Sequence, residues 1–529
     1  MTQQDNQDTR PNIVVILVDD MGFSDIGCYG SEIRTPNLNK LASEGAQFTQ
    51  MYNCARCCPT RASLLTGLYP HQAGVGHMVA DRGIPPYQGY LNDNCATIAE
   101  VLGDQGYRTL MSGKWHVGGN YTASEPENWR QGEAEFPIPT QRGFDHHYGT
   151  YGGGGSFFNP PTLSRDGKLI EPETEEYYYT DAISLNAAQM IEDAVSDNTP
   201  FFLYTAYTAP HWPLHALPED IAHYEGQYRS GWDDLRTSRH ETLKSLGIVS
   251  DKWVISPRDE KASAWTETEH QDWESLRMAT YAAQVDRMDR GVGTILDKLD
   301  ELGIADNTLI MFMSDNGGCA EFLAEDGGGP SKFRYDVPTR DGKPMRIGNT
   351  PKIEPGPADT FASYDLPWAN ASNTPFRLYK HWVHEGGIST PLLARWPGKT
   401  KSGQIVHAPA HVIDIMATCL DAAGVSYPAE QNSSPIASLQ GESLVPAFKD
   451  AAWRRERTIF WEHEGNRAVR DGDWKLVSKY PGEWELYNMG EDRTESTDLS
   501  GSNSGKAEDL KAAYIEWTEQ CGVVPWETL

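Results

Sequence analysis

The sequence predicts an α/β protein with a large mixed, mostly parallel sheet flanked by helices, followed by a smaller C-terminal antiparallel sheet plus helix. Residues 12–18 (NIVVILV) form a continuous run rich in β-branched residues, which is typical of a parallel strand buried on both faces. Similar apolar runs then alternate with helix-like segments. After about residue 452 the pattern changes to short alternating strands separated by turn residues.

Four predicted strands each lead into polar residues that are suited to chemistry. The strands cover residues 12–18, 107–112, 200–205 and 308–313, and helices are predicted at 35–45, 96–106, 182–194 and 273–302. In doubly wound sheets, ligands bind beyond the carboxyl ends of the strands. We therefore expect one edge of the sheet to gather the residues that follow these strands, which are Asp19, Asp20, Lys114, His116, His211, Asp315 and Asn316.

The chain of 529 residues is too long for one simple core. We expect a large α/β domain over residues 1–452, in which the polar, Trp-rich stretch 213–275 forms a cap or insertion. Residues 390–396 should add a core strand, and residues 411–424 a covering helix. A small α+β subdomain is expected over residues 453–529, with the strands TIFWEH, AVRDGDWKLVS and WELYNM and a closing helix over 507–520.

Composition excludes several classes of function. A net charge of −30 argues against binding to nucleic acid or to anionic membranes. The apolar run that ends at Val18 is too short to span a bilayer, and the N-terminus shows no signal-peptide pattern, so a cytoplasmic location is expected. Eight scattered cysteines do not suggest a disulfide framework.

The stretch CCPTRASLLTG begins at Cys57 and reads as the start of a helix. Pro59 suits the first helical turn, so Cys57 lies at or just before a helix N-terminus, where an anion is favoured. Cys54 and Cys57 could form a zinc or redox C-x-x-C pair, but no second pair completes a zinc site.

Two sets of side chains point to a metal-assisted reaction on an anion. Asp19, Asp20, Asp315 and Asn316 offer only oxygen ligands, which suit Ca²⁺, and less well Mg²⁺, rather than zinc or copper. The positively charged or proton-carrying residues could hold a compact dianion or a transferring oxyanion; they are Arg61, Lys114, His116, His211 and Lys380.

With these motifs the chain resembles the type I sulfatases of the alkaline-phosphatase-like superfamily, and in particular the cysteine-type bacterial arylsulfatases. The signature is C-x-P-x-R from Cys57 to Arg61 followed by LLTG. The resemblance covers essentially the whole chain and is weakest over residues 213–275. It continues through NIVVILVDDMG, GKWHVG, TAPHWP, MSDNGG, NTPFRLYKHWVHEGG and WELYNM.

The resemblance implies that a separate formylglycine-generating enzyme oxidises Cys57 to formylglycine (3-oxoalanine), whose hydrate attacks sulfur. It also implies a role for each site residue. Asp19, Asp20, Asp315, Asn316 and the modified Cys57 would hold Ca²⁺; Arg61 would steady the hydrate; Lys114 and Lys380 would bind sulfate oxygens; His116 would act as the base and His211 as the acid.

The expected function is that of an arylsulfatase, a sulfuric ester hydrolase acting on a small-molecule sulfate ester, with no nucleic acid or membrane as partner. Two alternatives stay open. One is a phosphonate monoester or phosphodiester hydrolase that uses the same nucleophile, because sulfate and phosphate esters share shape and charge. The other is a calcium-binding protein without catalytic activity. A small, uncharged leaving group is favoured by the acidic balance of the chain.

Overall fold

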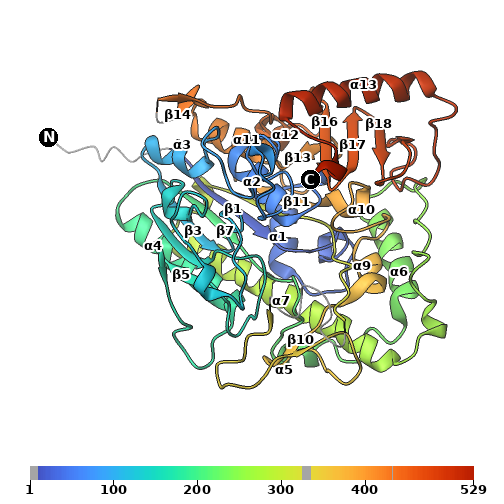
Figure 1. Ribbon diagram of the computed structural model, residues 1–529, viewed down its shortest axis with the longest axis horizontal. Helices are drawn as coiled ribbons and strands as arrows, with labels where there is room; N and C mark the ends of the chain where they lie inside the picture. The colour runs from blue at the N-terminus through green and yellow to red at the C-terminus, as the bar shows by residue number, and fades with distance from the viewer. Residues whose placement is uncertain (1–9, 325–334, 432) are drawn as a thin grey trace.

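The computed structural model describes residues 10–324, 335–431 and 433–529. Residues 1–9 lie outside the described part. They belong to the N-terminal segment from which a cytoplasmic location is expected. A central 11-stranded sheet lies between layers of helices (Figure 1). Its strand order is β12-β2-β11-β8-β1-β7-β3-β4-β5-β6, with β13 beside β2. The expected large mixed sheet is therefore confirmed.

The middle of the sheet is parallel, and its edges are mixed. The parallel strands are β1 (Asn12–Val18), β3 (Arg108–Gly113), β4 (His146–Thr150), β7 (Phe201–Ala206) and β8 (Thr308–Ser314). Strand β11 (Ser389–Arg395) runs antiparallel to both β8 and β2 (Ala46–Tyr52). The sequence analysis did not identify β2, β4 or the short edge strands, which are β5 (Leu163–Arg165), β6 (Lys168–Leu169), β12 (Gln404–Val406) and β13 (Ala410–His411).

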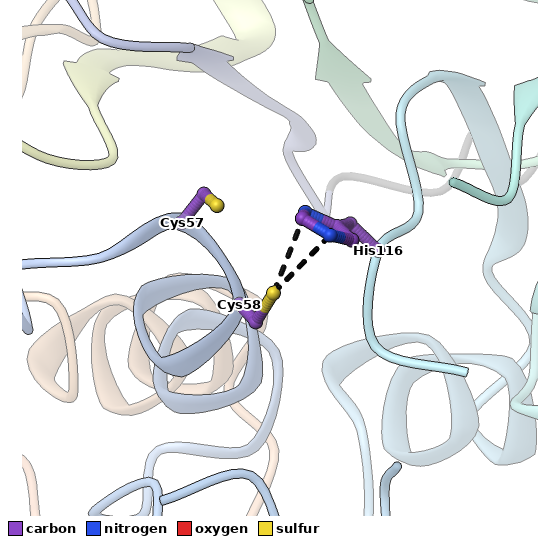
Figure 2. Close-up of side chains that lie close together, drawn as sticks. All are labelled: Cys57, Cys58 and His116. Carbon is purple, nitrogen blue, oxygen red and sulfur yellow. Dashed lines mark hydrogen bonds between the residues drawn. The ribbon is translucent and has the colours of Figure 1, made fainter. Parts of the chain in front are cut away.

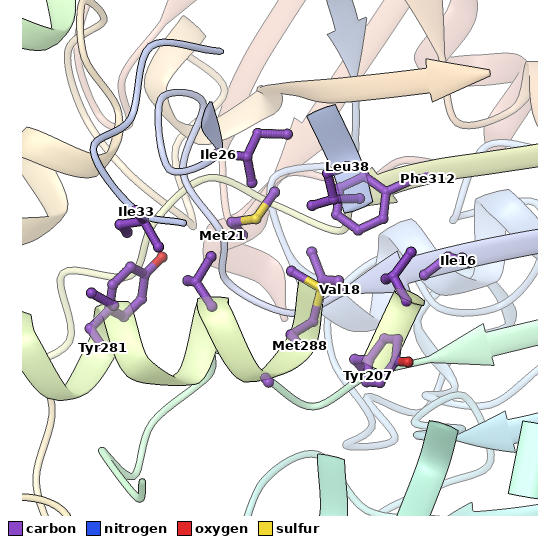
Figure 3. Packing of buried hydrophobic residues seen from close by; sticks show 14 of the residues in the cluster. Ile16, Val18, Met21, Ile26, Ile33, Leu38, Tyr207, Tyr281, Met288 and Phe312 are labelled. Atoms are coloured by element: carbon purple, nitrogen blue, oxygen red, sulfur yellow. The ribbon is translucent and has the colours of Figure 1, made fainter. Parts of the chain in front are cut away.

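Strand β1 is buried on both faces, as its sequence predicts. Val14, Ile16 and Val18 join the core on one side of the sheet, together with α1 (Pro36–Glu44), α4 (Tyr179–Ser196) and α7 (Gln271–Glu301) (Figure 3). The alternate residues of β1 join the other core, with α2 (Cys57–Thr66), α3 (Ile98–Asp104), α11 (Asp414–Ala423) and α12 (Val445–Lys449). Among the described helices, none is long and apolar enough to cross a membrane.

The stretch 213–275 contains α5 (Pro218–Ala222) and α6 (Gly231–Ser245), which the sequence analysis did not assign. Helix α6 packs against α9 (Asp365–Ser372). The Trp232 ring lies 5.2 Å from Trp368 and 4.8 Å from Trp265, both edge-on. These rings come from distant parts of the sequence and belong to the same buried core as Val14, Ile16 and Val18 of β1.

A separate antiparallel sheet follows near the C-terminus, as predicted. Its strands are β16 (Ile459–His463), β17 (Asn466–Asp471), β18 (Trp474–Ser478) and β19 (Glu485–Asn488), and α13 (Ser504–Cys521) covers it (Figure 1). The Trp517 ring of α13 stacks on Phe460 of β16 with centroids 5.3 Å apart. Further short elements include α10 (Glu385–Ile388), β9 (Arg346–Ile347), β10 (Thr360–Phe361), β14 (Glu430–Gln431) and β15 (Ser434–Pro435).

A buried ion cluster joins this C-terminal sheet to the central one. Glu385 of α10 lies 2.9 Å from Lys475 Nζ of β18 and 2.9 Å from Arg493 Nε, and it accepts a hydrogen bond from Tyr52 of β2. Lys475 also pairs with Glu495 at 2.8 Å. Burial raises the pKa of Glu385, but Lys475 and Arg493 outweigh it and hold that pKa at about 2.

Removing the charge of Glu385 should destabilise the protein. Glu385→Gln leaves Lys475 and Arg493 buried without their shared partner, a loss that costs about 3–5 kcal/mol in buried clusters. Because the folded pKa lies below the unfolded value of about 4.3, this stabilisation is present above that pH and is lost as the pH falls toward 2. Urea unfolding at neutral and acidic pH measures both effects.

The matched control is Glu133→Gln, because Glu133 pairs with Arg130 at 4.0 Å on the exposed surface. Its unfolding free energy should change by less than about 1 kcal/mol. Equal losses in the two variants would show that the Glu385 cluster does not hold the two sheets together.

Candidate active site

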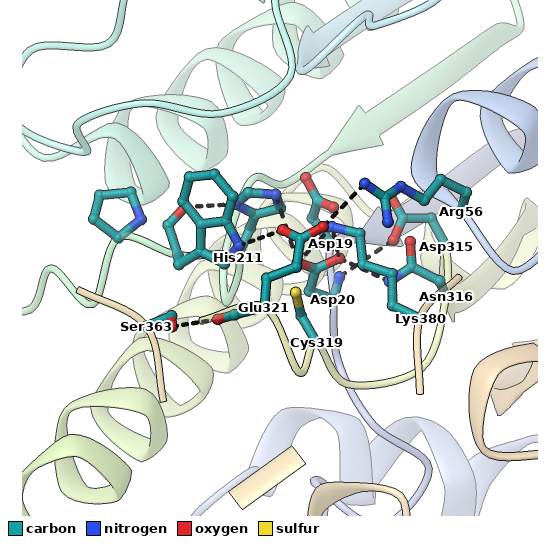
Figure 4. A network of polar contacts seen from close by, with 12 residues as sticks. Asp19, Asp20, Arg56, His211, Asp315, Asn316, Cys319, Glu321, Ser363 and Lys380 are labelled. Atoms are coloured by element: carbon teal, nitrogen blue, oxygen red, sulfur yellow. Dashed lines mark hydrogen bonds and ion pairs between the residues drawn. The ribbon is translucent and has the colours of Figure 1, made fainter. Parts of the chain in front are cut away.

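The four predicted strand ends meet at one edge of the sheet. Strands β8, β1, β7 and β3 are neighbours in that order, so the residues that follow them converge. Figure 4 shows Asp19 and Asp20 facing Asp315, Asn316 and His211, although these segments are far apart in sequence. The structure brings together every predicted site residue, each at most 6% exposed: Asp19, Asp20, Cys57, Arg61, Lys114, His116, His211, Asp315, Asn316 and Lys380.

Asp19 and Asp315 form the deepest part of the site with two cations. Lys114 Nζ lies 2.5 Å from Asp19 Oδ2, and Arg61 Nη2 lies 2.7 Å from Asp315 Oδ2. Burial raises the pKa of Asp19, but Lys114, His211 and Arg61 lower it to about 2. Burial and the charge of Asp19 raise the pKa of Asp315 well above its usual value. Additional positive charge is therefore needed to keep both carboxyls ionised.

Asp20 forms the other half of the carboxylate cluster. Lys380 Nζ and Asn316 Nδ2 donate to it at 2.9 and 2.7 Å. His211 Nε2 lies 3.5 Å from Asp20 Oδ2. The other ring nitrogen, His211 Nδ1, lies 2.5 Å from the carbonyl oxygen of Trp212. Since a carbonyl only accepts, Nδ1 carries a proton and Nε2 is left to face the site.

The donor set fits a hard divalent cation. Among the described residues, Asp19 Oδ1 and Asn316 Oδ1 are buried without a hydrogen-bond partner. Buried oxygens of this kind are costly unless something else binds them. The surrounding atoms are carboxylate and amide oxygens, the ligands that Ca²⁺ takes in proteins. Asp19, Asp20, Asp315 and Asn316 could therefore hold this ion.

Cys57 is the first residue of α2, as its sequence context predicts. The thiol of Cys58, together with Lys114 and His116, holds the pKa of Cys57 well below its ordinary value against the opposing effect of burial. Figure 2 shows the imidazole of His116 beside both cysteines, with Cys58 Sγ 3.3 Å from Nε2. Burial and Lys114 lower the pKa of His116 to about 4, so its ring is neutral near pH 7.

The loop that contains Gly153 and Gly154 packs closely against the two histidines of the site. A Cβ atom on Gly153 would lie 2.5 Å from the His116 ring, and one on Gly154 would lie 3.1 Å from His211. Both contacts are closer than ordinary van der Waals distance. Glycine therefore allows the backbone of this loop to lie directly against the imidazole rings of His116 and His211. No local sequence pattern predicted this contact.

A cavity of about 420 Å³ opens in front of these groups. Sequence analysis missed two charged residues in its wall, Arg56 and Glu321, which pair at 2.9 Å. Trp212 Nε1 also donates to Glu321 at 2.9 Å. Burial raises the pKa of Glu321, but Lys380 and Arg56 lower it to about 2. Adjacency in the sequence could have identified Arg56, which precedes Cys57, but no such signal marks Glu321.

Together, the sheet edge, the buried carboxylates and the surrounding cations define an α/β enzyme whose pocket suits a compact anion. The chain belongs to the sulfatase family, since the family model "Sulfatase" matches residues 11–425. A second model, "N-sulphoglucosamine sulphohydrolase, C-terminal", matches residues 376–515. The sulfatase family, to which this chain belongs, hydrolyses sulfate esters.

Similar proteins include several sulfatases. An uncharacterized sulfatase of Schizosaccharomyces pombe is 31% identical over 97% of this chain and 94% of its own length. An arylsulfatase of Klebsiella aerogenes is 33% identical over 85% of this chain and 94% of its own. The solved structure of Ps i-CgsB in complex with k-i-k-neocarrahexaose superimposes with a TM-score of 0.66 at 28% identity, covering 96% of this chain and 93% of that one.

Gly153→Ala should impair catalysis more than folding. The added methyl group would push the His116 ring aside, and misplacement of a catalytic group by about 1 Å can cost roughly 10²-fold in rate. Hydrolysis of a chromogenic sulfate ester measures the effect. The control is Gly103→Ala on α3, where the new Cβ would meet Thr109 at an ordinary 3.6 Å. Wild-type kcat in Gly153→Ala would show that the loop does not position His116.

Proposed function

We propose that this sulfatase is an arylsulfatase that acts through a formylglycine made from Cys57 by a formylglycine-generating enzyme. The observation that carries the proposal is the position of Cys57. It lies at the N-terminus of α2, lines the cavity, and faces His116 at the oxygen-rich sheet edge. A thiolate is a soft ligand and fits poorly beside a hard cation, whereas an oxygen at this position would complete the donor set.

Asp19, Asp20, Asp315 and Asn316 would hold Ca²⁺. In the proposal, Ca²⁺ supplies charge stabilisation and the hydrated formylglycine supplies the nucleophilic oxygen. Arg61 is fully buried and contacts Asp315 at 2.7 Å and the Lys114 carbonyl at 3.1 Å. Its guanidinium would keep the carboxylates ionised. It would also hold the modified residue 57 in position.

Two lysines would bind the sulfate oxygens. Lys114 follows β3 and Lys380 precedes α10, and each pairs with a carboxylate, Asp19 or Asp20. These pairs hold both ammonium groups in place before substrate arrives. Preorganised donors of this kind stabilise charge as it develops on a transferring group, without reorganisation during the reaction.

The two histidines suit opposite proton transfers. His211 keeps a proton on Nδ1 through the Trp212 carbonyl and directs Nε2 toward Asp20 and the cavity. A proton on Nε2 would pass to the leaving-group oxygen. His116 has a pKa lowered to about 4, so its neutral ring is available to accept a proton from residue 57.

The cavity wall favours an aromatic leaving group. Trp212, Tyr335 and Phe322 line it. Aromatic side chains offer large apolar surface to a phenyl ring. The similarity to the Klebsiella aerogenes arylsulfatase supports this choice. An N-acetylglucosamine-6-O-sulfatase of Bacteroides thetaiotaomicron, 27% identical over 94% of this chain, makes a sugar sulfate the necessary comparison.

The test combines the mass of the peptide that carries residue 57 with hydrolysis of an aryl sulfate. The wild type should show the mass of formylglycine or its hydrate. Cys57→Ala should lose at least about 10³-fold in kcat/KM, because it removes the nucleophile. Cys58→Ala is the matched control and should keep the modification. An unmodified thiol in fully active protein, or full activity in Cys57→Ala, would refute the proposal.

The same assay includes the matching aryl phosphate and a 6-sulfated N-acetylglucosamine. The aryl sulfate should have the highest kcat/KM of the three. A higher value for the phosphate would favour the phosphoryl-hydrolase alternative, and a higher value for the sugar would contradict the aryl preference. Turnover of none of them by modified protein would contradict the assignment as an arylsulfatase.

A further inference from the structure

A second group of potential metal ligands lies beside the cavity, outside the set assigned above. His463 ends β16, and Glu464 follows it in the tight turn to β17, with a φ of 50°. His381 comes from the loop before α10 and directly follows Lys380. One ligand atom from each of these three residues lies within 4.8 Å of the other two. Two distant parts of the chain thus contribute to a single cluster.

The spacing of the three ligand atoms suits a small tetrahedral ion. Glu464 Oε2 lies 2.8 Å from His381 Nδ1, and Glu464 Oε1 lies 3.8 Å from His463 Nε2. Bonds of about 2.0 Å to a tetrahedral Zn²⁺ place neighbouring ligand atoms about 3.3 Å apart. The two separations involve different oxygens of Glu464, and the ligand atoms of the three residues lie within 4.8 Å of one another, so side-chain rotation would bring them to this spacing.

The buried ring of His463 is an independent indication that this cluster binds a ligand. Its side chain is 0% exposed, and neither ring nitrogen has a hydrogen-bond partner among the described residues. A neutral imidazole binds a metal through the lone pair of its unprotonated ring nitrogen. An imidazole buried without any partner is otherwise costly.

A neighbouring group already orients one of the ligands. His77 Nε2 lies 2.7 Å from Glu464 Oε1. Such outer contacts fix the direction of metal ligands. The nearby positive charge of Arg56 is offset by Glu321, its partner at 2.9 Å. The cluster is thus compatible with a further cation.

We propose that His381, His463 and Glu464 form a binding site for Zn²⁺ or a similar divalent transition metal, separate from the oxygen-only site. Imidazole and carboxylate ligands suit such metals rather than Ca²⁺. Three protein ligands leave a fourth position for water. The ion would fasten the β16–β17 turn to the segment that carries Lys380, which is also held by the hydrogen bond from His381 N to the Ala55 carbonyl at 2.7 Å.

The test uses Co²⁺ as a spectroscopic probe in the full-length, calcium-loaded protein. The wild type should bind one equivalent with the visible absorption of tetrahedral Co²⁺, and Zn²⁺ should displace it and raise Tm. Glu464→Gln and His463→Gln should each weaken binding at least about 10-fold, because each removes a ligand. Glu464 is partly exposed, so its variant should fold, and far-UV circular dichroism confirms this.

The control is His146→Gln, which removes a histidine paired with Asp166 at 3.3 Å on the exposed surface. It should bind Co²⁺ like the wild type. Absence of the tetrahedral spectrum in the wild type would overturn the proposal. So would a spectrum with thiolate-to-cobalt bands that persists in both variants, because it would place the ion at Cys57, Cys58 and His116.

Discussion

Carboxylates at the carboxyl ends of β1 and β8 are buried, and they can stay ionised only when positive charge surrounds them. Moving an ion out of water costs several kcal/mol even after relaxation of the protein. Lys114, Arg61 and Lys380 supply part of the compensation, each through a contact of 2.9 Å or less. Burial and the charge of Asp19 nevertheless raise the pKa of Asp315. The proposed calcium ion would supply the remaining charge.

Much of this site could be predicted from the sequence because it depends on local patterns. The apolar run ending at Val18 predicted a strand whose end presents Asp19 and Asp20, and Pro59 predicted that a helix begins at Cys57; the structure confirms both. The pair between Arg56 and Glu321 could not be predicted, because it joins residues 265 positions apart through folding alone. Strand β2 was missed because AQFTQMY mixes polar with apolar residues although it is almost entirely buried.

The C-terminal sheet contributes to the site without lining the cavity. Glu385 ties it to the central sheet through Lys475 and Arg493, and the β16–β17 turn contacts His381 next to Lys380. A displacement of this sheet would therefore shift Lys380, a lysine of the proposed sulfate site. The expected boundary at residue 452 stays a prediction.

The central claim is that the oxygen cluster holds Ca²⁺, and metal analysis of the purified protein tests it most directly. The wild type should contain one tightly held calcium per chain. Asp315→Asn should lose that calcium, because the substitution removes a charged ligand. A fully active wild-type protein that contains no calcium, or equal calcium in Asp315→Asn, would contradict the account.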